Sequence, residues 1–340
     1  MHQMSHSDEQ LLRNEILTID ADNFEKTAIE VFNFQYINNE TYKTYCNLLR
    51  INPTEISSIE KIPFLPIQFF KTQQIKTTSF KEQAIFESSG TTGSTNSKHF
   101  VKDLSFYEES FLQTFRQFYG NEKELCIIGL LPSYLERKNS SLVYMVNDLI
   151  KKSAKKNSGF YLYEHSKLKN ILLENEAALQ PTLLIGVTYA LLDFAEENEM
   201  KLANTTVMET GGMKGRRKEL TRTQVHDRLI LKLGVNKIHS EYGMTELLSQ
   251  AYSNGDGIFK SPTYMRILIR GEDDPFKIFA NVSPKKKFIE GGINIIDLAN
   301  LYSCSFIATD DYGKLYNNKS FEILGRLENS STRGCGLMLL

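Results

Sequence analysis

A stretch rich in hydroxyl side chains and glycine, Ser88-Ser89-Gly90-Thr91-Thr92-Gly93, is followed closely by Lys98. The glycines allow backbone amides to turn toward an anion, the hydroxyls add donors, and the lysine adds a positive charge. This combination predicts a loop that binds nucleotide phosphates. The stretch lacks the Gly-Lys-Ser/Thr ending of the P-loop NTPases, and no Gly-x-Gly-x-x-Gly opens a helix here. A polar surface loop would have the same composition, so composition alone leaves both interpretations open.

Two more polar motifs, Thr210-Gly211-Gly212 and Glu241-Tyr242-Gly243-Met244-Thr245-Glu246, also lie just past candidate strands. Ligands of parallel sheets bind at the carboxyl ends of the strands. We therefore expect the three motifs to lie at one edge of a sheet.

Apolar runs alternate with helical periodicity in the middle of the chain. Strands are predicted at residues 125–131, 182–187 and 206–209, each with a helical stretch after it. Ser105-Phe106-Tyr107-Glu108 has the pattern of a capping box and predicts a helix that runs to Gly120. This alternation predicts an α/β fold with a largely parallel sheet that is covered on both faces.

The predicted elements divide the chain into four parts. Residues 1–60 form a helical entry layer, and residues 61–257 form the α/β core with the phosphate loop. A β-rich subdomain follows at residues 258–326, and residues 327–340 are a short tail. The apolar run from Ile62 to Lys71, broken twice by proline, is interpreted as core packing.

Composition narrows the functional class. The 340 residues are 41% hydrophobic and 24% charged, and the formal net charge is -1, so nothing attracts the whole molecule to nucleic acid or to an anionic membrane. The start has no apolar signal region, and the apolar runs are shorter than the about 20 residues of a membrane span. The four cysteines are far apart without a Cys-x-x-Cys pair, which disfavours zinc and disulfides. We expect a cytoplasmic protein with reduced thiols.

Five motifs occur together in a characteristic order. The order of these motifs and the approximate spacing between them resemble those of the adenylate-forming enzyme superfamily. The resemblance covers the chain from about Pro63 onward. Within it, the chain most resembles the acyl-protein synthetases of bacterial luminescence systems and their relatives beside the phenylacetate-CoA ligases. The motifs are Ser88 to Gly93, Gly211-Gly212, Tyr242-Gly243-Met244-Thr245-Glu246, Thr309-Asp310-Asp311-Tyr312-Gly313 and Gly325-Arg326.

The resemblance implies an ATP site with Mg²⁺. The loop from Ser88 to Gly93, with Lys98, would hold the β- and γ-phosphates, although Lys98 lies further from Gly93 than in most of the superfamily. Asp310 replaces the usual glycine and makes its predicted turn unusually acidic. The other implied contacts are Gly211 and Gly212 along adenine, Tyr242 stacked on the base with Gly243 and Met244 beside it, Thr245 at the α-phosphate, Glu246 on Mg²⁺, Asp311 on the ribose, and Arg326 on the ribose and phosphate side.

The resemblance also implies the reaction, which is activation of a carboxylic acid, with fatty acids favoured, as an acyl-adenylate and transfer of the acyl group to a thiol. Superfamily members usually carry a C-terminal lysine domain, which we expect to be missing because so few residues follow Arg326. The luminescence synthetases have their acyl-accepting cysteine near the end of the chain, which makes Cys335 the candidate nucleophile. Glycines on both sides give Cys335 mobility, and Arg333 favours its thiolate. An exposed cysteine in a frayed terminus remains the alternative.

Three functions stay open. The acyl group passes to a protein thiol and then to a partner such as a reductase or carrier, or it passes directly to coenzyme A. In the third alternative, the chain is a non-catalytic nucleotide-binding subunit. The acid itself does not follow from the sequence, because the depth of its pocket depends on packing.

Overall fold

The structure is a computed structural model, and it describes residues 6–88, 95–131, 139–211 and 220–327. The α-helices in these ranges are α1 His6–Thr18, α2 Phe24–Asn38, α3 Glu40–Leu48, α4 Phe69–Thr72, α5 Leu104–Tyr119, α6 Ser141–Ser153, α7 His165–Ala177, α8 Thr188–Glu197 and α9 Arg222–Leu233. The strands are β1 Leu65–Pro66, β2 Ala84–Glu87, β3 Lys98–Val101, β4 Cys126–Leu130, β5 Gly159–Phe160, β6 Thr182–Val187, β7 Thr205–Thr210, β8 Ile238–Tyr242, β9 Ala251–Ser253, β10 Ile258–Lys260, β11 Met265–Arg270, β12 Ile278–Phe279, β13 Phe288–Asp297, β14 Phe306–Tyr316 and β15 Phe321–Arg326.

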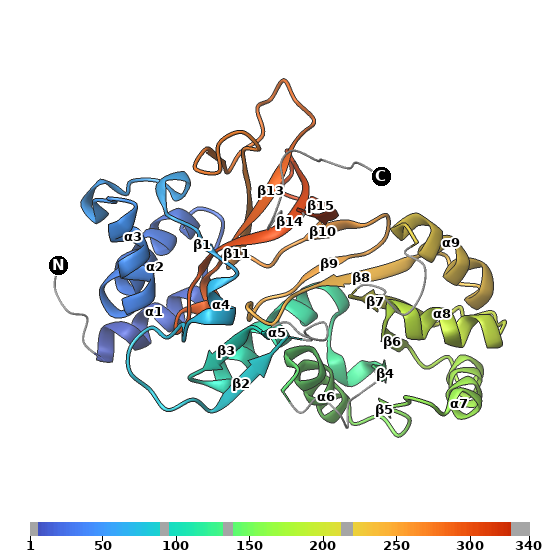
Figure 1. The fold of residues 1–340 in the computed structure, drawn as a ribbon. Helices are drawn as coiled ribbons and strands as arrows, with labels where there is room; N and C mark the ends of the chain where they lie inside the picture. Colours follow the sequence, from blue (N-terminus) through green and yellow to red (C-terminus); the bar gives the residue numbers. More distant parts are fainter. Residues whose placement is uncertain (1–5, 89–94, 132–138, 212–219, 328–340) are drawn as a thin grey trace.

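One 13-stranded sheet organises the molecule, in the order β12-β11-β13-β14-β15-β10-β9-β8-β7-β6-β4-β5, with β1 paired to β14 (Figure 1). Strands β5, β4, β6, β7 and β8 are parallel to one another. From β8 onward the neighbours are antiparallel, through β9, β10, β15 and β14 to β13. The strands beyond residue 258 therefore extend the same sheet that begins in the α/β part.

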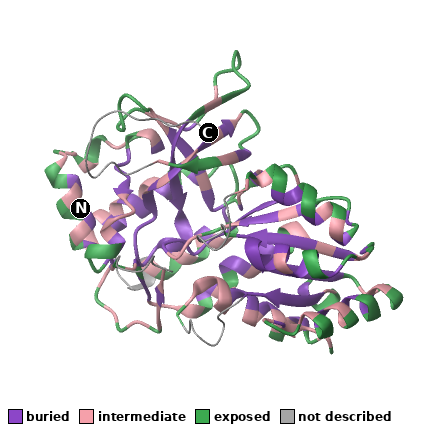
Figure 2. Cartoon of the chain, turned by 45° about the vertical axis from the view of Figure 1, so that its right-hand side comes forward, coloured by how far each residue is buried: buried purple, intermediate pink, exposed green. Residues whose placement is uncertain are grey.

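Helices cover both faces of the parallel part. On one face, Tyr119 of α5 lies 3.2 Å from the His239 ring, and Tyr252 of β9 contacts Met145 of α6. On the other face, Glu209 accepts a hydrogen bond from Thr188 at the start of α8. Two-sided covering explains why β4 and β6 are buried along their whole length (Figure 2). The predicted α/β class is confirmed.

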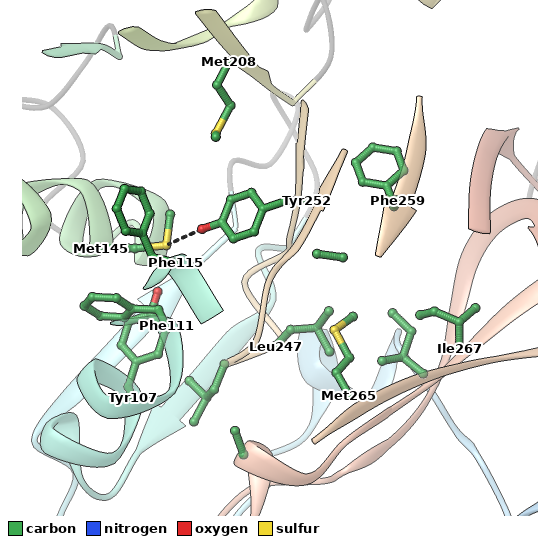
Figure 3. Packing of buried hydrophobic residues seen from close by; sticks show 14 of the residues in the cluster. Tyr107, Phe111, Phe115, Met145, Met208, Leu247, Tyr252, Phe259, Met265 and Ile267 are labelled. Carbon is green, nitrogen blue, oxygen red and sulfur yellow. Dashed lines mark hydrogen bonds between the residues drawn. The ribbon is translucent and has the colours of Figure 1, made fainter. Parts of the chain in front are cut away.

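Aromatic and thioether side chains fill the space between the sheet and helices α5 and α6 (Figure 3). The Tyr252 hydroxyl points at the sulfur of Met145 at 4.0 Å, and the Tyr107 and Phe111 rings meet edge to face at 4.9 Å. Phe115 lies in the same cluster. This packing supports β8 and β9, the two strands that flank the Tyr242 to Glu246 motif in the chain.

Two local predictions are corrected by the structure. Helix α5 begins at Leu104, and its N-cap is Asp103, whose carboxylate accepts from the backbone of Ser105 and Phe106. The predicted capping box at Ser105 is therefore wrong, because the Asp103 side chain already accepts hydrogen bonds from the amides of the first turn. The Thr309 to Gly313 motif is not a turn but lies inside the long strand β14.

Candidate functional site

The end of β8 meets β14 and β15 across the sheet, and this junction gathers three of the predicted nucleotide residues. The Tyr242 hydroxyl donates to Asp311 Oδ2 at 2.7 Å. Arg326 Nε lies 3.5 Å from Asp311 Oδ1, because Asp311 and Arg326 are paired residues of β14 and β15. The Arg326 side chain is 84% exposed, so it extends from the rim while Asp311 stays buried.

The Asp311 carboxylate is buried, where a negative charge is less stable than in water. Burial raises the pKa of its carboxyl, while the hydrogen bond from Tyr242 and the charge of Arg326 act in the opposite direction. The strand amide of Asp311 donates to Thr309 Oγ1 at 3.1 Å, which fixes the backbone beside the carboxylate. A carboxylate oriented this way can accept hydrogen bonds from two neighbouring hydroxyls.

The backbone of the Thr245-Glu246 pair is clamped by buried side chains. Asn300 Nδ2 donates to the Glu246 carbonyl at 2.8 Å. Asp297 accepts the amides of Leu248 and Ser249 at 2.8 and 3.0 Å. These bonds hold the segment after β8 on the 3₁₀ turn Leu298–Asn300 that follows β13. The pair therefore has a defined position although it lies in a loop.

Glu246 suits a single-carboxylate metal site. Burial raises the pKa of its carboxyl, and the Ser97 hydroxyl, Lys71 and Arg326 act to lower it. No group of three or more His, Cys, Asp or Glu side chains in the described ranges could hold a metal ion. Mg²⁺ in nucleotide sites is commonly bound by one or two carboxylates, with phosphate oxygens and water completing its shell. Glu246 fits that pattern, with the ion brought by the nucleotide.

The two ends of the predicted phosphate loop are joined. Ser88 donates its amide to the Ser97 carbonyl at 3.1 Å, and the Ser97 amide donates to Ser88 Oγ at 2.9 Å. The ends lead out of β2 and into β3, which form a separate two-stranded sheet. The other loop residues assigned to phosphate binding, Ser89, Gly90, Thr91, Thr92 and Gly93, lie outside the described residues.

Lys98 and His99 take opposite faces of β3. Lys98 is 52% exposed and lies 3.8 Å from Glu87 across the hairpin. His99 is buried, and its Nδ1 donates to the Thr245 carbonyl at 2.8 Å. Burial lowers the pKa of His99 to about 4, so the ring is neutral at neutral pH. The hairpin thus reaches the Thr245-Glu246 segment through Ser97 and His99, while Lys98 faces the other way.

Gly211 follows β7 with a φ of 71°, in the left-handed region that glycine adopts without strain. Its carbonyl and the Glu209 carboxylate both accept from the Thr188 hydroxyl, which fastens this turn to α8. Gly212, and the basic stretch after it, lie outside the described residues. The predicted adenine contact therefore has one described member, Gly211.

Gly243 and Met244 lead from β8 into the clamped loop. A Cβ at position 243 would collide with Glu241 Oε1, so the glycine is needed by the chain's own packing. The Met244 carbonyl accepts from the Leu247 amide at 3.1 Å and forms the turn toward Leu247. These two residues shape the loop beside Tyr242 and Thr245.

Sequence reasoning missed several polar residues that contact the site. Gln68 donates to Asp310 Oδ1 at 2.6 Å, Lys71 acts electrostatically on Glu246, and Asn300 holds the Glu246 carbonyl. Their local sequence carries no motif, because each reaches the site through a contact between distant parts of the chain.

The cysteines outside the tail are structural. Cys46, Cys126 and Cys304 are buried, as predicted for packing residues. Burial raises the pKa of Cys46 to about 12, which keeps its thiol protonated. Cys335 lies outside the described residues.

The sequence matches the family described as "Acyl-protein synthetase, LuxE" over residues 8–340. The chain belongs to this acyl-protein synthetase family. The family assignment confirms the resemblance inferred from the ordered motifs, and it confirms that the chain belongs to a family of enzymes. A comparison with curated proteins found no match.

Solved structures of adenylate-forming enzymes share the fold of this chain. A 2-hydroxyisobutyryl-CoA ligase in its postadenylation state with R3-HIB-AMP gives a TM-score of 0.62 at 9% identity, covering 94% of this chain and 71% of that one. ATP-bound MatB from Rhodopseudomonas palustris gives 0.53 at 15% identity, covering 72% and 48%. The luciferase-like enzyme from the mealworm Zophobas morio gives 0.50 at 13% identity, covering 74% and 60%. This chain thus spans about half the length of MatB.

Among the described residues, no helix is long and apolar enough to cross a membrane.

Proposed function

We propose that this chain activates a carboxylic acid with ATP as an acyl-adenylate and passes the acyl group to a protein thiol. The observation that carries the proposal is the meeting of distant motifs at one edge of the sheet. Asp311 lies against Tyr242, and the hairpin that bears the phosphate loop is tied to Thr245 and Glu246. Membership of an acyl-protein synthetase family supports the same conclusion.

The nucleotide half of the site is divided between two regions. Asp311 and Arg326 would bind the ribose, with Tyr242 and Gly211 along the base. The loop from Ser88, with Lys98 at its end, would bind the β- and γ-phosphates, and Thr245 the α-phosphate. Glu246 would hold Mg²⁺, which supplies charge neutralisation at the phosphates when it is bound.

The proposed chemistry has two steps. An oxygen of the acid attacks the α-phosphorus, the bond from that phosphorus to the oxygen bridging to the β-phosphate breaks, and pyrophosphate leaves. A thiolate then attacks the acyl carbon, a thioester forms, and AMP leaves with the electron pair of the broken anhydride bond. Cys335 is the proposed thiol, and a partner protein is the proposed final acceptor.

The first experiment is carboxylate-dependent exchange of labelled pyrophosphate into ATP with a panel of acids from short aromatic to long aliphatic. Fatty acids are the first candidates, and we expect at least one of them to support exchange. ATP binding without exchange for any acid would contradict acyl activation and favour a non-catalytic nucleotide-binding subunit.

The second experiment follows the acyl group. With ATP and a labelled acid that supports exchange, we expect label on the protein in a hydroxylamine-sensitive bond, and we expect Cys335→Ala to abolish it while exchange continues. Cys46→Ala is the matched control, because its thiol is buried and should not carry label. Label retained by Cys335→Ala contradicts that residue's role, and label found only on added coenzyme A favours an acyl-CoA ligase.

A further inference from the structure

The short helix α4 and the residues before it form a third wall of the candidate site. From the sequence we interpreted this stretch as core packing, and Phe70 is indeed buried. The polar residues on either side of Phe70 have a different role, because Gln68 hydrogen-bonds to Asp310 and the charge of Lys71 acts on Glu246. Lys71 itself is exposed.

Contacts on two sides fix the position of this segment. Strand β1 pairs with β14, with Pro66 opposite Ala308, and the Ile67 amide donates to the Ala308 carbonyl at 2.9 Å. Gln68 then bonds to Asp310 at 2.6 Å, next to the ribose-binding candidate. Helix α4 therefore begins beside the nucleoside part of the site.

Helix α4 also contacts the hairpin of β2 and β3, which bears the predicted phosphate loop. The Phe70 ring packs edge to face on the His99 ring, with centroids 6.0 Å apart. His99 in turn holds the Thr245 carbonyl. Lys71 follows Phe70 directly, and its charge acts on the Glu246 carboxylate. The lysine thus projects from a segment fastened to both the ribose side and the phosphate side.

The charge partners of Lys71 and Lys98 differ. Lys98 faces Glu87 at 3.8 Å, on the side of β3 away from Ser97 and His99. Within the described part of the chain Lys71 has no ion-pair partner. A lysine without an ion pair beside a carboxylate suited to Mg²⁺ matches the charge pattern of a metal-polyphosphate ligand, which presents anionic oxygens to the lysine and a cation to the carboxylate.

We propose that Lys71 binds the polyphosphate of ATP and supplies the positive charge on the Glu246 side of the site. The inference rests on the proposed nucleotide site and goes beyond it by assigning a residue outside the ordered motifs. The ligand class is a nucleoside triphosphate, and the contact is with the phosphates beyond the α position. Nucleoside monophosphate binding should accordingly not depend on Lys71.

The test is equilibrium dialysis of labelled ATP and labelled AMP with the full chain, with Mg²⁺ and with EDTA. A charge-assisted contact to phosphate predicts that Lys71→Ala weakens ATP binding roughly tenfold or more, while AMP binding changes little. Lys71→Arg should restore most of the ATP affinity, because it keeps the charge. Lys81→Ala is the matched control, an exposed lysine on the loop between α4 and β2, and should bind ATP as the wild type does.

Several results would overturn the assignment. Lys71→Ala could bind ATP as tightly as the wild type, or it could bind ATP and AMP equally more weakly. Lys98→Ala could lose the preference for ATP over AMP while Lys71→Ala keeps it. Finally, the wild-type chain could fail to bind ATP. Because binding is measured without an acid, failure of the exchange reaction would contradict the proposed function and leave this test decisive. Thermal unfolding of each variant verifies that the protein is folded.

Discussion

Glu241 is a buried residue of the site region whose packing changes the pKa of its carboxyl. It is buried at the end of β8 and accepts a hydrogen bond from Thr210 of the neighbouring strand. Burial raises its pKa to about 7, Thr210 acts to lower it, and the nearby Glu209 raises it further. Its other oxygen occupies the space beside Gly243. The neutral, protonated form is therefore the one that this position favours.

This raised pKa predicts a pH-dependent stability. The folded protein holds the Glu241 proton more tightly than the unfolded chain, where the ordinary value is 4.5. The contribution is fully present below 4.5 and is lost as the pH rises toward 7. We expect wild type to lose about 2 to 3 kcal/mol relative to Glu241→Gln between roughly pH 5 and pH 8, measured as the urea unfolding free energy. Parallel pH profiles of the two proteins would contradict this explanation.

At the level of single elements, helix α5 shows that contacts with the rest of the fold help to determine which residue caps a helix. Both Asp103 and Ser105 are residue types that cap helices, and the sequence pattern favoured Ser105. In the fold, Asp103 accepts from two amides of the first turn and also lies 3.4 Å from Arg13 of α1. The contact with α1 comes from tertiary structure and could not be derived from the local pattern.

The assignment of this cap is testable with a set of variants. Asp103→Ala should lower the unfolding free energy by about 1 kcal/mol, because it leaves first-turn amides without an acceptor. Asp103→Asn should recover most of that loss, since the amide oxygen still caps the helix, and Ser105→Ala should cost less than Asp103→Ala. Urea denaturation of all three variants provides the measurement. A larger loss in Ser105→Ala would restore the capping box as the helix start.

At the scale of the whole molecule, the parallel and antiparallel parts meet between β8 and β9, and the candidate site lies at that junction. The bond from Tyr242 to Asp311 connects β8 to β14 across the intervening strands (Figure 1). The clamp from Asp297 and Asn300 connects the same loop to the far part of the sheet. A nucleotide bound here would contact both parts of the sheet at once.

Binding at this junction should stabilise the fold as a unit. A ligand that binds only the native state adds about 2.7 kcal/mol when its concentration is 100 times Kd. We expect ATP with Mg²⁺ to raise the thermal midpoint in a single cooperative transition. Asp311→Asn should reduce that rise at equal ATP concentration, because the carboxylate proposed to bind the ribose is lost. An unchanged rise in Asp311→Asn, measured by calorimetry, would argue for nucleotide binding elsewhere.

Sequence patterns predicted the strands β4, β6 and β7 and the helices α6, α8 and α9, but not strand β5 and helix α7 between them. The residues that form β4 and β6 are apolar runs of strand length, and this pattern is local, so it can be recognised before the pairing of the strands is known. The order of the motifs likewise identified the family, because each motif is a short run of fixed residue types. The fold class and the family could therefore be predicted from the sequence alone.

The tertiary structure alone decided which residues face one another. Asp311 lies within a strand because β13 and β15 pair on either side of β14, and Lys98 faces Glu87 because alternation along β3 directs His99 inward. The same long-range pairing brings Gln68 and Lys71 to acidic residues of the site. Such contacts join residues far apart in sequence, so they depend on the strand order and register of the complete sheet, which no local pattern contains.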